Sequence, residues 1–311
     1  MSDSEPDSAP DELSDDEKLA IVKHFLMTCP PGQLPDMVTD IEKLVPSGLL
    51  SNEIIQRYSK EYNLRHGVVI NTPFESRTVL SKEAEISSND SVYYCSKNRK
   101  VYGFDHVSRT TFEAESIEPP ISSGYLQAEQ VNIQNALNEY MSKRYTTPEN
   151  AACAFTLSGT NMLVKIIAEK ANLKNYWSGK WTSSWKITFP KSTEFDNSDI
   201  QSAFVADTME KNVSVSGYIQ IIAHYFEDGN VQLNTTKSIP AFDVKYVTTD
   251  ELARELVKAI EKIENEIQGS LNDMYREMHD HTLRAMRRTL PVTRTKMEWN
   301  MNAHQMNKTV L

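Results

Sequence analysis

Two histidines near the C-terminus have a spacing that could suggest a metal site. His279 and His281 flank Asp280, in a stretch where apolar residues recur at helical spacing. Side chains two residues apart on a helix diverge by about 200°, so the two imidazoles cannot share one ion. We therefore interpret this stretch as solvated helix surface.

The other candidate chemical groups stand alone. His24 near Cys29 and His224 beside Tyr225 are best interpreted as packing residues. The chain lacks the glycine-rich phosphate-binding motifs, the G-x-S-x-G nucleophile motif and the H-E-x-x-H zinc motif. Its 10 glycines in 311 residues are also few for a protein that holds phosphates with its backbone. We predict that the protein is not an enzyme and has no catalytic residue, metal site or cofactor.

A basic segment gives the stronger functional signal. Arg284, Arg287 and Arg288 stand at i, i+3 and i+4 and would share one face of a helix. The negative end of a helix dipole explains one or two such residues. It does not explain the continuation through Arg294 and Lys296, beyond a helix-ending proline. Because arginine makes forked contacts with carboxylates, we predict that this segment binds an acidic protein surface.

The charge is unevenly distributed along the chain. Residues 1–17 carry eight acids and no base, whereas residues 281–311 carry six bases and one acid, a local charge of +5. Because the whole chain carries −10, residues 1–280 carry −15. A polyanion such as an acidic phospholipid headgroup or RNA is an alternative ligand for the basic end. The acidic body argues against nucleic acid.

An aromatic cluster is the remaining candidate binding feature. Trp177, Trp181 and Trp185 are three of the four tryptophans and fall within nine residues. They could form a stacking platform for nucleic acid or carbohydrate. Large aromatic side chains are more typical of cores and subunit interfaces, so we favour packing and group Tyr225 with them.

The elements that must position these residues begin with helices. Residues 1–12 are predicted to be a disordered acidic tail. A capping box from Ser14 to Glu17 starts the first of three short helices, which the prolines and glycines at 30–32 and 46–48 separate. Such short connections imply antiparallel packing. We therefore predict a three-helix stalk over residues 13–64.

The pattern then changes to strands. We predict a small β-rich segment over residues 65–124, a helix over 125–145 and an antiparallel sheet over 146–247. The Asp228–Gly229 pair between two apolar runs indicates a hairpin, because both turn residues need a positive φ. Residues 191–213 are polar and are predicted to be a long surface loop.

A long helix is predicted over residues 248–290. A capping box of Thr248 and Glu251 starts it, and Pro291 ends it. Its apolar positions follow an 11-residue repeat, which keeps the apolar stripe nearly straight and suits a helix lying across a sheet. The residues after it, 291–311, form an extended basic tail. The central residues of the stripe, predicted to be core or subunit interface, are Ile260, Ile263, Ile267 and Leu271.

Cysteine usage and hydropathy indicate the compartment. Three widely spaced cysteines and an N-terminus without signal-peptide features predict a cytosolic protein with reduced thiols. No stretch of about 18 apolar residues is present, so no transmembrane segment is predicted.

Three stretches of this sequence resemble the α subunit of F-actin capping protein. They are LRAMRRTLPVTRTKMEWN at 283–300, NYWSGKWTSSWK at 175–186 and HYFEDGNVQL at 224–233. Similarity extends from about residue 13 to 300 and is weak over roughly 66–120, and the tail after Asn300 departs from the usual sequence of the family. The 191–213 stretch has the character of an insertion.

The resemblance implies an α+β fold with a helical stalk, a sheet shared between two subunits, and a long helix across it. The C-terminal tentacle would cap the barbed end of actin filaments by steric occlusion, independently of calcium. By position, Arg284 and Arg288 match critical basic residues of the family, and Trp299 matches a tentacle tryptophan. Arg287, Arg294 and Lys296 are basic neighbours in the same signature.

The implied partners are a β subunit, or a second copy of this chain, and the actin barbed end in the cytoplasmic cytoskeleton. Two alternatives remain open. One is a structural subunit that caps an actin-related filament in a dynactin-like complex. The other is a scaffold that binds polyanions or phosphoinositides, and phosphoinositide binding could also coexist with capping as its inhibitor.

Overall fold

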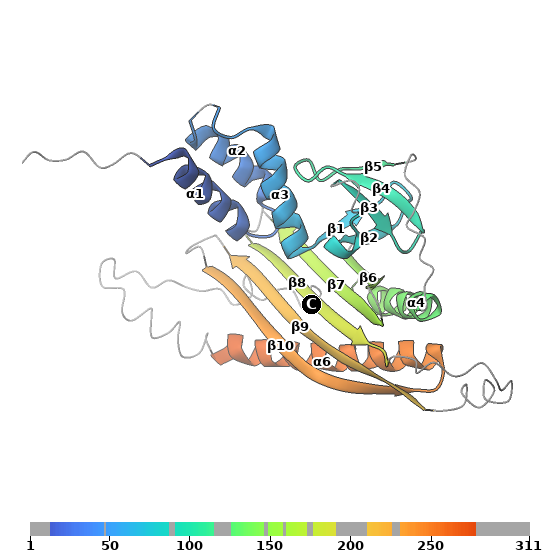
Figure 1. The fold of residues 1–311 in the computed structure, drawn as a ribbon. Helices are drawn as coiled ribbons and strands as arrows, with labels where there is room; N and C mark the ends of the chain where they lie inside the picture. Colours follow the sequence, from blue (N-terminus) through green and yellow to red (C-terminus); the bar gives the residue numbers. More distant parts are fainter. Residues whose placement is uncertain are drawn as a thin grey trace, which may run out of the picture.

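The structure is a computed structural model, and the fold is α+β, as the sequence predicted. Three helices come first, followed by small sheets, one large antiparallel sheet and a long helix across it (Figure 1). Its described residues are 13–46, 48–86, 91–114, 126–145, 149–157, 160–172, 177–190, 210–225 and 231–277.

The helical stalk consists of α1 (Asp15–Thr28), α2 (Leu34–Leu44) and α3 (Asn52–His66). The predicted capping box is present: Ser14 Oγ accepts from the Glu17 amide at 3.3 Å, and a Glu17 carboxylate oxygen accepts from the Ser14 amide at 2.9 Å. The three helices bury an apolar core of their own. The buried members of this core are Val22, Leu26, Met27, Cys29, Leu34, Val38, Ile41, Ile55, Tyr58 and Tyr62.

Two small antiparallel sheets follow the stalk. One pairs β1 (Val68–Asn71) with β2 (Arg77–Leu80). The other has the order β3 (Val92–Cys95), β4 (Lys100–Phe104), β5 (Thr111–Glu113). A 3-10 turn, η1 (Lys82–Ala84), lies between them in sequence.

The large sheet has five antiparallel strands in the order β10-β9-β8-β7-β6. Their bounds are β6 (Asn150–Thr156), β7 (Asn161–Asn172), β8 (Trp177–Thr188), β9 (Lys211–Tyr225) and β10 (Val231–Tyr246). Every neighbour in the sheet is a neighbour in sequence, so the sheet is a meander. Tyr225 pairs with Val231, and the turn predicted at Asp228–Gly229 lies outside the described residues.

The predicted 191–213 loop extends too far at its C-terminal end. Residues 211–213 are the first residues of β9, and the loop therefore ends before Lys211. Val213 and Val215 are buried in the sheet core, whereas Lys211, Asn212 and Ser214 are exposed. This polar and apolar alternation is that of a strand with one solvated face, and its polar members made the stretch resemble a loop.

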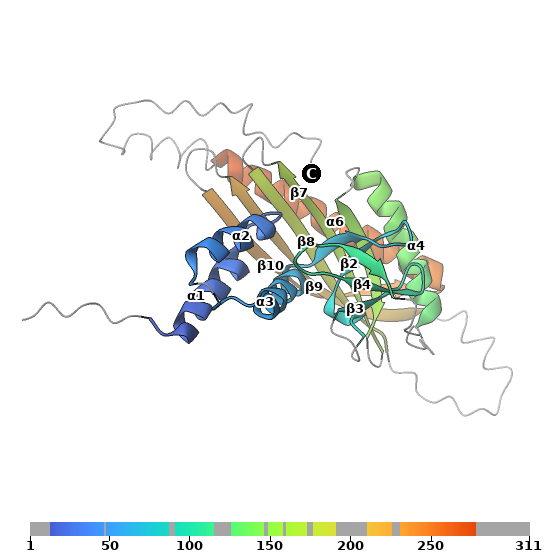
Figure 2. The ribbon, with the colours of Figure 1, turned by 90° about the horizontal axis from the view of Figure 1, so that it is seen from above.

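The two faces of the large sheet carry different elements (Figures 1 and 2). Along β6, Ala151, Cys153 and Phe155 pack with the small sheets, whereas Ala152 and Ala154 face the other core. On that second face lie α4 (Gln127–Arg144) and α6 (Thr249–Glu277), with α6 running across the strands. Alternation along the strands thus separates the two cores.

The long helix α6 begins as predicted, with the Glu251 amide donating to Thr248 Oγ1 at 3.2 Å. Leu252, Leu256 and Ile260 are fully buried against the sheet. The described helix ends at Glu277, and the predicted continuation to residue 290 lies outside the described residues. Among the described helices, none is long and apolar enough to cross a membrane.

Candidate interaction site

The six residues predicted to bind actin lie outside the described part of the chain, which ends at Glu277. The same holds for His279 and His281. The structure therefore bears on the site through α6, which leads into residues 278–311, and through the surfaces available for a partner subunit. The residues beyond Glu277 that sequence analysis predicted for actin binding are Arg284, Arg287, Arg288, Arg294, Lys296 and Trp299.

The structure places the three clustered tryptophans along β8. Trp185 is fully buried and meets Phe242 of β10 edge-on, with ring centroids 6.4 Å apart. Trp181 is also buried, whereas Trp177 at the start of the strand is half-buried. Tyr225 stands opposite Trp177 in the register, but its side chain lies outside the description. Trp181 and Trp185 thus have no face open for stacking a ligand.

The burial of the apolar residues of α6 decreases along the helix. Ile260 is fully buried and Ile267 nearly so, whereas Ile263 and Leu271 are half-buried against the same core. These four residues hold α6 on the sheet, and the stripe becomes more exposed towards the C-terminal end of the described helix.

A charged residue interrupts this apolar face. Glu264 is completely buried, and both of its carboxylate oxygens accept hydrogen bonds. Tyr140 Oη donates to Oε2 at 2.6 Å, and Tyr145 Oη donates to the same oxygen at 2.9 Å. Ser183 Oγ donates to Oε1 at 2.6 Å. One residue of α6 thereby joins the end of α4 to the middle of β8.

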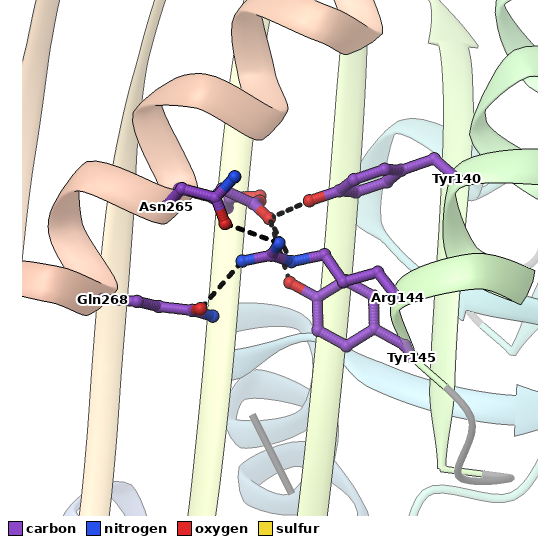
Figure 3. Close-up of polar contacts among 7 residues, drawn as sticks. Tyr140, Arg144, Tyr145, Asn265 and Gln268 are labelled. Carbon is purple, nitrogen blue, oxygen red and sulfur yellow. Dashed lines mark hydrogen bonds and ion pairs between the residues drawn. The ribbon is translucent and has the colours of Figure 1, made fainter. Parts of the chain in front are cut away.

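Arg144 completes the cluster from the last turn of α4 (Figure 3). Its Nη1 donates to Asn265 Oδ1 at 2.6 Å, and its Nη2 donates to Gln268 Oε1 at 2.8 Å. Its Nε lies 3.9 Å from Glu264 Oε2. The planar guanidinium therefore bonds to two successive turns of α6 and also balances the buried negative charge of Glu264.

Burial and charge together set the protonation of this cluster. Burial raises the pKa of Tyr140, and the neighbouring Glu264 carboxylate raises it further. The pKa of Tyr145 is raised well above its usual value for the same two reasons. Burial alone would lower the pKa of Arg144, but Tyr140, Tyr145 and Glu264 reverse the direction and raise it. The tyrosines therefore remain hydrogen-bond donors, and Arg144 remains charged, across the physiological range.

Sequence analysis did not identify Glu264, although a signal was present. Glu264 stands four residues after Ile260 and three before Ile267, which places it on the buried face of the helix. An acidic residue within an apolar stripe requires a polar partner, because a buried charge without one is costly. The identity of its partners, from α4 and β8, could not be found from helical spacing.

The second available feature is the free edge of the large sheet. At one edge, β6 contacts α4 and β2. At the other edge, β10 runs for 16 residues, and no described strand pairs with its outer side. Strands typically have five or six residues, and a long uncovered edge is a template for pairing with another chain. Pro240 stands beside a register shift between Ile239 and Phe242, which is a position that an edge strand tolerates.

A groove of about 420 Å³ separates the stalk from the sheet surface of β9 and β10. Three histidines line it: His24, His66 and His224. Gln33 Nε2 lies 3.2 Å from His224 Nδ1, and His66 Nε2 lies 3.2 Å from the Met27 carbonyl oxygen. Within the described ranges, no three His, Cys, Asp or Glu side chains are grouped to hold a metal ion.

Comparison with known proteins agrees with this arrangement. Residues 22–309 match the family described as F-actin capping protein alpha subunit. The F-actin-capping protein subunit alpha of Dictyostelium discoideum is 30% identical over 295 residues, which cover 92% of this chain and 94% of that protein. The corresponding subunit of Caenorhabditis elegans is 28% identical over 292 residues, covering 93% and 95%.

A solved structure has the same fold. It is the homodimeric actin capping protein alpha subunit from Plasmodium berghei, with a TM-score of 0.69 and 20% identity, covering 90% of this chain and 99% of that one. With nearly the whole chain matched in sequence and in fold, this protein belongs to the F-actin capping protein alpha subunit family.

Proposed function

We propose that this chain caps the barbed end of actin filaments as one subunit of a dimeric capping protein in the cytoplasm. The observation that carries the proposal is the extent of the family match, which runs through residue 309. It therefore includes the whole basic segment and Trp299. Capping would block the addition and loss of actin subunits by occupying the filament end, without a chemical step.

The free edge of β10 supports a dimer. A partner strand added to this edge would satisfy the outward N–H and C=O groups along its 16 residues. It would also continue the five-stranded sheet into a second subunit. The partner is a capping protein β subunit or a second copy of this chain, and the relative from Plasmodium berghei is described as homodimeric.

The basic segment supports an acidic target. Exposed ion pairs contribute only about 0.2–1 kcal/mol each, so several arginines and a buried aromatic anchor must act together. Arg284 and Arg288 would steer the complex to actin, and Trp299 would anchor it. Tight capping then also needs the tail of the partner subunit.

The test is the elongation of pyrene-labelled actin from barbed-end seeds. We would measure this chain alone and co-expressed with a candidate β subunit, in calcium and in EGTA. We expect inhibition by the dimer in both buffers, and at least tenfold weaker inhibition by Arg284→Ala with Arg288→Ala. The matched control is Arg254→Ala with Lys262→Ala, which removes the same charge from the exposed face of α6. A folded dimer without effect on elongation would refute capping of conventional actin.

The local charge of +5 also favours a second candidate function, the binding of phosphoinositide headgroups by the same arginines. Co-sedimentation with phosphoinositide vesicles, compared between the wild type and the Arg284/Arg288 double variant, would test it. Capping of an actin-related filament in a dynactin-like complex would use the same end geometry. Elongation assays seeded with that filament distinguish it from capping of conventional actin.

A further inference from the structure

We propose that Glu264 is a positioning residue that fixes the register and direction of α6 on the sheet, and hence the direction in which the C-terminal segment leaves it. The first part rests on the contacts of Glu264. The second part, the effect on capping, rests on the proposed function.

The apolar stripe alone does not define one register. Apolar contacts are non-directional, and α6 presents apolar residues at intervals of three and four along the buried face. A slip of one helical turn, about 5.4 Å, would move Leu252 into the place of Leu256 and Leu256 into the place of Ile260. Both leucines would therefore still meet an apolar surface after such a slip.

Glu264 makes the same slip unfavourable. A shift by four residues places Ile260 or Gln268 beside the hydroxyls that now donate to Glu264. It also leaves the Glu264 charge buried away from Tyr140 Oη, at 2.6 Å in the structure, and from Ser183 Oγ, also at 2.6 Å. A buried polar group that specifies register at some cost in stability is known from coiled coils.

The donors to Glu264 come from two different directions, which also fixes the tilt of the helix. Ser183 lies on β8, beneath the helix, whereas Tyr140 lies on α4, beside it. Arg144 reaches Asn265 and Gln268 on adjacent turns. A helix held from below and from the side can neither slide nor rotate without breaking bonds.

The described part of α6 extends well beyond Glu264, so a small tilt at Glu264 displaces the end of the helix. From Glu264 to Glu277 the helix rises about 20 Å, at 1.5 Å per residue. A tilt of about 10° at Glu264 therefore moves Glu277 by about 3 Å. Arg284 and Arg288 lie seven and eleven residues after Glu277 in the sequence, and under this proposal the displacement is passed on to them.

The experiment combines a distance measurement with the elongation assay. Spin labels at Lys186→Cys on β8 and Glu277→Cys on α6 report the position of the helix end, and both sites are exposed. Labelled chain is diluted with unlabelled chain in the assembled dimer, so that each spin pair lies within one protomer. We expect Glu264→Gln to broaden or shift the distance distribution by about 3 Å and to weaken capping at least tenfold. The matched control, Glu266→Gln, removes the same charge from an exposed position and should change neither.

A second variant separates positioning from stability. Glu264→Leu combined with Arg144→Met, Tyr140→Phe, Tyr145→Phe and Ser183→Ala replaces the polar cluster, including the cation that balances Glu264, by apolar groups, and such replacements are often neutral or stabilising. We expect this variant to melt at or above the temperature of the wild type and still lose the narrow distance distribution. It also keeps the test decisive if Glu264→Gln does not fold.

Each outcome is decisive. An unchanged distance distribution in both variants overturns the positioning role. A changed distribution with unchanged capping overturns its effect on function. If the wild type does not cap at all, the proposed function fails, and the distance distribution alone still decides whether Glu264 sets the register.

Discussion

Lys180 on β8 and Glu169 on β7 face each other in the sheet register and form a buried ion pair, with Nζ 3.1 Å from Oε2. Their side chains are only 4% and 12% exposed, which distinguishes this pair from the surface pairs of the chain. The Lys180 ammonium also donates to the Gly67 carbonyl oxygen at the end of α3. The pair therefore connects the large sheet to the helical stalk.

Replacing one member of this pair should lower the free energy of unfolding more than replacing both. We expect Lys180→Met to lower the free energy of unfolding by about 3–5 kcal/mol, because it leaves the Glu169 charge buried without its partner. Adding Glu169→Met should recover most of that loss and leave about 1–3 kcal/mol for the unpaired Gly67 carbonyl. Urea denaturation of the two single variants and the double variant measures the coupling.

The exposed pair Lys245–Glu210, with side chains 67% and 60% exposed, is the control for that cycle. Its coupling should not exceed about 1 kcal/mol. Equal coupling energies at the two sites would contradict the role assigned to burial.

Stability should fall in mild acid because of His106. Burial, reinforced by the nearby Lys60, lowers the pKa of His106 to about 4. The ring is enclosed by Tyr93, whose Oη lies 2.9 Å from Nε2, and by Asn63, whose Nδ2 lies 3.4 Å from Nδ1. Between about pH 6.5 and 4, the unfolded chain binds a proton at this residue that the folded chain does not. The folded state therefore loses up to about 3 kcal/mol as the pH falls through that window.

The measurement is the free energy of unfolding at pH 7 and at pH 4.5, for the wild type and for His106→Gln. The variant should lose clearly less stability on acidification, because glutamine does not titrate. His24→Gln, at an exposed histidine of α1, should behave like the wild type. The prediction fails if the wild type and His106→Gln lose the same amount.

Two glycines in neighbouring strands should respond oppositely to alanine. A Cβ at Gly217 would collide with the Ser184 carbonyl oxygen and come within 2.8 Å of Trp185 Cε3. We therefore expect Gly217→Ala to push β9 away from β8 and destabilise the chain by about 1–3 kcal/mol. At Gly179, the nearest atoms to a new Cβ lie 3.9 Å away, so Gly179→Ala should be neutral or stabilising. Thermal melting compares the two, and a larger loss at Gly179 would contradict the packing described.

Proline substitutions can test the dimer contact proposed for β10. Along an edge strand, successive N–H groups point alternately towards the sheet and away from it. Of Thr235→Pro and Thr236→Pro, one therefore removes an N–H that bonds to β9, and the other removes an outward N–H. We expect the first to destabilise the fold and the second to leave a folded monomer.

Sedimentation equilibrium and circular dichroism distinguish these states. If both variants fold and remain dimeric, the partner does not pair with this edge of the sheet.

Much of the fold could be predicted from local patterns. The capping boxes at Ser14 and Thr248, the stripe through Leu252 and Ile260, and the apolar run of β9 each belong to one element and are visible in one stretch of sequence. The start of β9 was missed because exposed polar residues alternate with Val213 and Val215. The partners of the buried polar groups could not be predicted from local periodicity.

The cluster at Glu264 shows why. Its donors come from residues 140, 145 and 183, and these reach one carboxylate only after the sheet has formed and both helices have packed on it. The same holds for Lys180, whose partners include a carbonyl oxygen 113 residues away in sequence. Buried polar groups can be noticed in a sequence, but their partners are a property of the assembled tertiary structure.

The helical stalk has an apolar core of its own, and its apolar contacts with the rest of the described chain include Val107 against that core and Leu64 against the core of the small sheets. Several of its other contacts are polar. They include Lys180 with the Gly67 carbonyl, Gln33 with His224, and Asn63 with the carbonyl oxygen of His106. Regions joined by few apolar contacts often open as separate cooperative units. The amide hydrogens of α1, α2 and α3 should therefore exchange with solvent together, through an opening that leaves β7 and β8 closed. A stalk that opens and closes as one unit would give the protein a hinge between α3 and the large sheet.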